Sequence, residues 1–137
     1  MSPTVLKVAV CLYTDVTNLD YIGPLELFTF LSPEPIKNGF IKSDILMEPT
    51  YFHYDNKPFR GSYIGPLITP DRAYDDLKEG EQFDIILVPG GKPISQRFLS
   101  IRPWRMSLGI HNTRCWLFTR SYSAFYSQIP PTPGPWC

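Results

Sequence analysis

Two nearly unbroken apolar runs lie at the beginning and near the end of the first ninety residues. Residues 5–12 (VLKVAVCL) and 83–88 (FDIILV) are rich in β-branched side chains and contain few polar ones. Such runs are typical of strands that are buried on both faces, as in the middle of a parallel sheet. We therefore predict two parallel strands that lie near each other in one sheet.

An amphipathic segment follows the first run, after a polar turn at residues 14–18. Apolar side chains recur about every third residue, at Ile22, Leu25, Phe28 and Leu31. This spacing places them in one stripe on a helix. Pro24 suits the first helical position, because the N–H that proline lacks needs no partner there. The pattern predicts a helix over about residues 23–31.

The middle of the chain is more extended. Residues 44–47 fit a second parallel strand that ends before Pro49. A small antiparallel ribbon is predicted after it, because residues 50–54 and 62–64 flank a turn. His53, between aromatic residues, is then expected to be a ribbon residue rather than a catalytic one. Residues 68–76 predict a loop with one helical turn. Strands that alternate with a helix and a ribbon favour an α/β fold with a mostly parallel sheet.

The formal charge of the chain changes sign after Gly91. All 13 Asp and Glu lie in residues 1–91, whereas residues 92–137 contain six Lys and Arg and no acid. All three tryptophans and six of the prolines also lie in residues 92–137. With about 25% charged residues on average, an acid-free stretch of this length is rare. We therefore treat residues 92–137 as a basic tail of different character.

Composition also excludes several classes of protein. No segment reaches the roughly 18 apolar residues of a membrane span, and the N-terminus lacks the features of a secretory signal, so we expect a cytoplasmic protein without a membrane partner. Three cysteines at no metal-like spacing predict neither a disulfide framework nor a metal site. The charges of the tail are too sparse for a nucleic-acid surface.

Two chemical features are expected at one edge of the sheet. Ligands of open α/β sheets bind beyond the carboxyl ends of the strands. Asp20 follows the first predicted strand and its loop, and Gly90 and Gly91 follow the last. Backbone N–H groups of glycine can approach an oxygen closely because no Cβ obstructs them. An acid facing a glycine turn is a half-site for acyl or carbonyl chemistry; the alternative is a helix-capping aspartate beside an ordinary turn.

Three segments, in chain order, carry a family resemblance. They are residues 12–28 (LYTDVTNLDYIGPLELF), 65–76 (GPLITPDRAYDD) and 83–91 (FDIILVPGG). Together they resemble landmarks of the ThiJ/PfpI family, in the class I glutamine amidotransferase-like superfamily, over about residues 5–91. The first segment is most similar to the isocyanide hydratase branch of that family.

The resemblance implies a flavodoxin-like fold and a site for cysteine-dependent chemistry. The fold has helices on both sides of a mostly parallel sheet. The activity is hydration or hydrolysis of a small molecule without a cofactor. In that site Asp20 would be the acidic partner of a nucleophilic cysteine, and the backbone N–H groups of Gly90 and Gly91 would contribute to an oxyanion hole.

The nucleophile motif of the family is missing. The family places its cysteine on a tight elbow, normally Ala/Val-Cys-Thr-Gly. Cys115 is the candidate at the right distance, but Trp116 and Leu117 follow it instead of the glycine that permits the strained turn. Cys11 lies in the first predicted strand, so we expect it to be a core thiol.

The resemblance divides the chain into two parts. Residues 1–91 are the N-terminal part of a ThiJ/PfpI-like domain, and residues 92–137 are an atypical tail that does not resume the family pattern. The change of composition directly after Gly91 leads to the hypothesis that the tail is out-of-frame or intron-derived coding sequence. The expected fold is a truncated flavodoxin-like three-layer sandwich followed by an irregular tail.

This division determines the functional expectation. We predict little or no hydratase or hydrolase activity, although the sequence leaves open whether the chain is an enzyme. The alternative is a non-catalytic fragment or interaction protein that binds an intact relative. An active chain would take a small-molecule substrate, with no cofactor and no nucleic acid, and a homodimer is the assembly to be tested.

Overall fold

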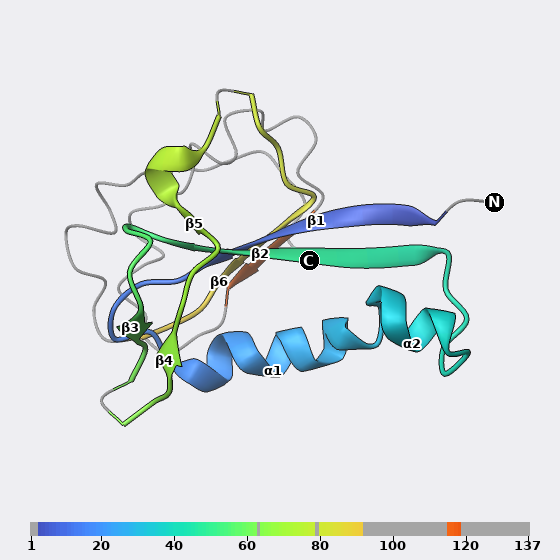
Figure 1. Cartoon of the computed structure of the whole chain (residues 1–137), viewed down its shortest axis with the longest axis horizontal. Helices are drawn as coiled ribbons and strands as arrows, with labels where there is room; N and C mark the ends of the chain where they lie inside the picture. The colour runs from blue at the N-terminus through green and yellow to red at the C-terminus, as the bar shows by residue number, and fades with distance from the viewer. Residues whose placement is uncertain (1–2, 63, 79, 92–114, 119–137) are drawn as a thin grey trace.

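The protein is built on a parallel β-sheet (Figure 1). The computed structural model describes residues 3–62, 64–78 and 80–91, and the backbone of residues 115–118. The order of the strands in the sheet is β5-β2-β1-β6-β7, and every neighbouring pair is parallel. The strands are β1 (Thr4–Cys11), β2 (Ile45–His53), β5 (Arg72–Ala73), β6 (Ile85–Val88) and β7 (Cys115–Phe118). The expected α/β fold with a mostly parallel sheet is confirmed.

Strand β1 lies in the middle of the sheet, between β2 and β6. Its residues from Val8 to Cys11 are fully buried, as are Ile86 and Leu87 of β6. Because successive side chains of a strand point to opposite faces, this continuous burial means that both faces are covered. The two apolar runs of the sequence are therefore the two central strands, as predicted.

Helix α1 (Asn18–Thr29) begins five residues earlier than the predicted start at residue 23. Pro24 consequently lies inside the helix and not at its first position, so this part of the prediction is wrong. The residue before the helix, Thr17, is extended, and its carbonyl oxygen accepts a hydrogen bond from the Asp20 N–H at 3.1 Å. Asn18, the last residue of the polar turn, thus begins the helix, and Asp20 lies in its first turn, where the helix dipole favours an acidic side chain.

The helices lie along one side of the strands (Figure 1). Tyr21 of α1 is buried, and Leu25 and Phe28 pack against the core. A second helix, α2 (Pro33–Lys37), follows directly, and the helical turn predicted in residues 68–76 is the 3₁₀ helix η1 (Tyr74–Asp76). Within the described residues, no second layer of α-helices covers the other side of the sheet, so the expected three-layer arrangement is represented there only in part.

Strand β2 continues through Pro49 to His53. The predicted end before Pro49 is wrong, and residues 50–53 belong to the parallel sheet rather than to a ribbon. The antiparallel ribbon instead consists of β3 (Phe59–Arg60) and β4 (Leu67–Ile68). His53 is accordingly the last residue of β2 and not a ribbon residue.

The position of Pro49 explains why the strand tolerates it. The Met47 N–H donates to the Leu31 carbonyl at 2.9 Å, and the Tyr51 N–H donates to Asp71 Oδ2 at 2.8 Å. Both amides therefore point away from β1. Alternate residues of a strand direct their amides to the same side, so the nitrogen of Pro49 also faces away from β1. The hydrogen bonds between β1 and β2 lose no donor.

Part of the tail belongs to the sheet. Residues 115–118 form β7, which pairs in parallel with β6 in the register Ile85↔Cys115 to Val88↔Phe118. The expectation of an irregular tail is therefore wrong for these residues. Trp, Leu and Phe favour strands, and the side of β6 away from β1 offers a row of backbone groups for pairing.

No helix of the described part of the chain is long and apolar enough to cross a membrane.

The central aromatic residue Phe52 provides a test of the core. Its side chain is fully buried, with ring centroids 6.0 Å from Tyr74 and 5.5 Å from Phe83. We expect Phe52→Ala to lower the free energy of unfolding by about 3–5 kcal/mol, because the substitution leaves a cavity. The control Phe40→Ala removes a side chain that is 81% exposed, and its effect should stay within about 0.5 kcal/mol. Similar losses in both variants, measured by urea denaturation, would contradict this core.

Candidate active site at the carboxyl edge of the sheet

The loops after β1 and β6 are joined by backbone hydrogen bonds. The Thr17 N–H donates to the Gly90 carbonyl at 2.8 Å, and Val16 forms an antiparallel bridge with Gly91. Both loops leave the sheet at its carboxyl edge because β1 and β6 are parallel neighbours. The contact therefore holds the start of α1 against the turn that follows β6.

Asp20 and the glycine turn meet at this edge. The Gly90 N–H donates a hydrogen bond to Asp20 Oδ2 at 3.1 Å. Asp20 lies in the first turn of α1, where the positive end of the helix dipole also favours its negative charge. The expectation that Asp20 and the glycine pair share one edge of the sheet is confirmed. The catalytic role of these groups stays a prediction.

Gly91 is required by the close approach of the two loops. A Cβ at this position would lie 2.6 Å from the carbonyl oxygen of Asp15 and 2.8 Å from the hydroxyl of Tyr13. Both distances are shorter than side chains tolerate. Asp15 itself has a φ of 68°, in the left-handed region that aspartate adopts more readily than most residues. The loop after β1 thus bends sharply to bring its backbone onto Gly91.

Tyr13 supports the same turn through a hydrogen bond. Its hydroxyl donates to the Pro89 carbonyl at 2.9 Å, and its side chain is almost fully buried. Burial, and to a lesser extent the charge of Asp20, raises the pKa of Tyr13 above its ordinary value. The hydroxyl therefore remains a donor at all physiological pH values. No sequence pattern predicted this role, and its one signal is a tyrosine directly after a buried apolar run.

The described cysteines lie away from the Asp20–Gly90 contact. Cys11 is fully buried in β1, and burial raises the pKa of its thiol to about 12, against a smaller lowering by Tyr74. The expectation of a core thiol is confirmed. Cys115 is the first residue of β7 and pairs with Ile85, the first residue of β6. Its backbone therefore lies at the amino end of the strands, whereas Gly90 follows their carboxyl end.

The side chain of Asn18 anchors the β3–β4 ribbon near the candidate site. Asn18 Nδ2 donates to Ser62 Oγ at 3.0 Å. Gly61 and Gly65 pack so closely around this amide that a Cβ on either would collide with it. The ribbon is thereby fixed to the first turn of α1, two residues before Asp20. The polar turn pattern of the sequence did not reveal this contact.

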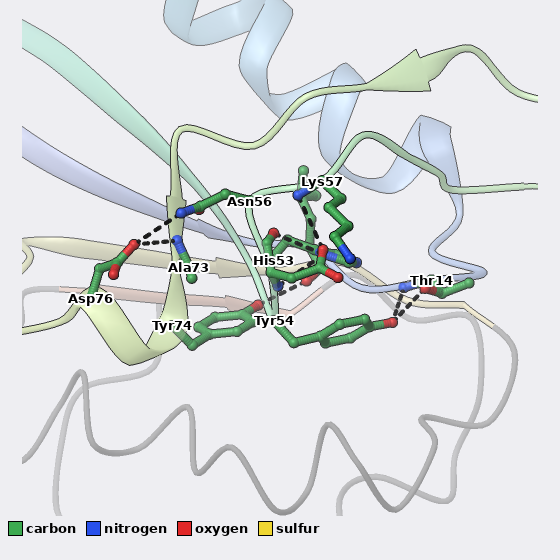
Figure 2. A network of polar contacts seen from close by, with 10 residues as sticks. Thr14, His53, Tyr54, Asn56, Lys57, Ala73, Tyr74 and Asp76 are labelled. Carbon is green, nitrogen blue, oxygen red and sulfur yellow. Dashed lines mark hydrogen bonds and ion pairs between the residues drawn. The ribbon is translucent and has the colours of Figure 1, made fainter.

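A second polar cluster surrounds His53 at the end of β2 (Figure 2). The His53 side chain is 2% exposed, and its ring stacks on Phe59 with centroids 3.9 Å apart. His53 Nδ1 lies 3.2 Å from Asp55 Oδ1, whereas Nε2 has no hydrogen-bond partner among the described residues. Figure 2 also shows Tyr54 reaching the loop after β1, where the Thr14 N–H donates to its hydroxyl at 2.7 Å.

The described residues contain no group of three or more side chains that could hold a metal ion.

No family model and no curated protein sequence matches the chain. Among solved structures, the chain is similar to the DJ-1 superfamily protein Atu0886 from Agrobacterium tumefaciens, with 22% sequence identity and a TM-score of 0.40. The similarity covers 63% of this chain and 38% of that protein, so this chain spans less than half of its length.

The close approach at Gly91 can be tested against a second glycine. We expect Gly91→Ala to destabilise the protein by about 1–3 kcal/mol, because its Cβ would force the two loops apart. Gly23 lies inside α1 with nothing within 4 Å of a Cβ, so Gly23→Ala should be neutral or stabilise by up to about 1 kcal/mol. Thermal unfolding of both variants measures the contrast. Equal effects would show that the loops do not need the glycine.

The buried His53 predicts a pH dependence of stability. Burial lowers its pKa below the ordinary value of 6.5, with an opposing effect of Asp55. The unfolded chain therefore binds a proton at higher pH than the folded protein, and stability falls as the pH drops from 7 through 6.5 towards the folded pKa. We expect His53→Gln to reduce this decline, measured by urea denaturation between pH 8 and 5. The wild type and the His53→Gln variant both contain His111, so His111 does not cause a difference between them. If the decline is the same in both proteins, a group other than His53 causes it.

Proposed function

We propose that residues 1–91 are the N-terminal part of a ThiJ/PfpI-like domain, and that Asp20 and the glycine turn are half of a cysteine-dependent site. The corresponding reaction is hydration or hydrolysis of a small isocyanide or carbonyl-like substrate. The observation that carries the proposal is the 3.1 Å hydrogen bond from the Gly90 N–H to Asp20 Oδ2, at the carboxyl edge of a parallel sheet. The three ordered sequence motifs support the family.

The contacts suggest different roles for the two glycine amides. The Gly90 N–H already donates to Asp20, so it holds the carboxylate in place. The Gly91 N–H has no acceptor among the described residues and is the better donor for negative charge that develops on a substrate oxygen. Asp20 would transfer or position a proton for the reaction. Tyr13, through Pro89, would keep the turn in the orientation that both roles require.

We further propose that the chain as written has little or no such activity. A covalent mechanism needs a thiolate within hydrogen-bond reach of its acidic partner. Cys11 is buried with a raised pKa, and the backbone of Cys115 lies at the opposite end of the strands. A displacement of about 1 Å can already cost on the order of 100-fold in rate, and here a strand length separates the groups.

An activity assay of the full chain tests this proposal. We expect isocyanide hydration at the background rate for the wild-type chain, and the same rate for Asp20→Ala and Cys115→Ala. Cooperative urea unfolding of the same preparation shows that the inactive chain is folded. Turnover that disappears in both variants would contradict the proposed inactivity and would assign the nucleophile to the tail. A folded but inactive chain also agrees with the alternative of a non-catalytic fragment that binds an intact relative.

A further inference from the structure

A groove of about 250 Å³ lies between α1 and β2, and neither Asp20 nor Gly90 lines it. One wall consists of side chains from successive turns of α1, beginning at Tyr21 and extending to Ser32 after the helix. The other wall is formed by Met47, Pro49 and Tyr51 of β2. Most of these side chains are apolar or aromatic. The proposed hydratase half-site does not account for this groove.

Two tyrosines supply hydrogen-bond donors to the groove. Within the described part of the chain, no hydrogen bond engages the hydroxyl of Tyr21 or of Tyr51. Burial raises the pKa of both side chains, so their hydroxyls remain protonated. Pro49 contributes no N–H to this region. A ligand that presents carbonyl oxygens and apolar rings therefore matches these two donors and the apolar walls.

Proline-rich segments have this chemistry. They adopt the polyproline II conformation, offer backbone carbonyls without N–H groups, and bind to grooves lined by aromatic side chains. The chain itself contains such a segment, residues 129–136 (IPPTPGPW), in which Pro130 and Pro133 have the P-x-x-P spacing. At about 3.1 Å per residue, residues 130–135 would span about 16 Å. The helical wall from Tyr21 to Ser32 has a similar length, about 16 Å at 1.5 Å per residue.

The length of the connection also permits this docking. Ten residues separate Phe118, the end of β7, from Ile129, and they can span up to about 33–36 Å. Strand β7 is three strands away from β2, a distance of about 14 Å across the sheet.

We propose that the groove between α1 and β2 binds the proline-rich segment 129–136 of the same chain. The rings of Pro130 and Pro133 contact the apolar walls, and the hydroxyls of Tyr21 and Tyr51 donate to backbone carbonyls of the segment. The interaction fixes the C-terminal end of the tail on the domain that precedes it. It does not depend on the proposed catalytic half-site.

Paramagnetic relaxation from a nitroxide on Cys137 tests the docking. The full chain carries Cys115→Ser so that the label reacts only at Cys137, because Cys11 is buried. We expect selective broadening of the amide signals of residues 21–29 and 47–51 in a dilute ¹⁵N-labelled sample. Pro130→Ala together with Pro133→Ala should abolish most of it. Tyr51→Phe keeps the ring but removes one hydrogen bond, so the bound fraction should fall with an affinity loss of about 3–10-fold.

Matched controls make the result decisive. Leu27→Ala changes an exposed residue of the same helix that does not line the groove, and it should leave the broadening unchanged. Broadening that survives both proline substitutions would overturn the proposal, as would broadening spread evenly over the domain. A mixture of ¹⁵N-labelled chains without nitroxide and spin-labelled chains without ¹⁵N should show none. Broadening in that mixture would show that the segment docks on another copy of the chain and not on its own chain.

Discussion

The parallel pairing of β1 with β2 on one side and β6 on the other determines where every other feature lies. Residues Val8 to Cys11 of β1 are fully buried and pair in register with Pro49 to Phe52 of β2. The same register brings the loops after β1 and β6 to a common edge. It also places β2 where α1 can pack beside it, with the groove between them. A shift of one residue would disrupt all of these arrangements at once.

At the carboxyl edge, close backbone contact rather than side-chain chemistry organises the candidate site. Gly91 allows the loop after β1 to approach, Thr17 bonds the Gly90 carbonyl, and Asp20 accepts the Gly90 N–H. Tyr13 and Asn18 stabilise the surroundings through Pro89 and Ser62. Contacts of the fold itself thus hold the Asp20 carboxylate against the Gly90 amide. Neither described cysteine lies beside these groups, because Cys11 is in a central strand and Cys115 begins β7 at the amino end of the strands.

The features that the sequence predicted depend on local pattern. The two apolar runs were recognisable because complete burial requires continuous apolar character, and Asp20 and Gly90 followed from the rule that parallel strands share a carboxyl edge. Pro24 and Pro49 misled the prediction, because each was taken as a boundary although the helix and the strand continue through it. The roles of Tyr13, Asn18 and His53 arise from contacts between distant segments. The hydrogen bond from Tyr13 to Pro89, for example, joins residues 76 positions apart, which no local pattern encodes.

Pro49 has a consequence for how the molecule behaves among other copies of itself. Strand β2 is nine residues long, and among the described strands β5 pairs only with its last two residues, Phe52 and His53, so most of its outer side is a row of backbone groups with no strand beside it there. Such a row is a template for intermolecular strand addition and aggregation. Along that row the Met47 and Tyr51 amides are engaged by Leu31 and Asp71, and proline at position 49 removes the donor between them. The edge therefore resists the addition of foreign strands.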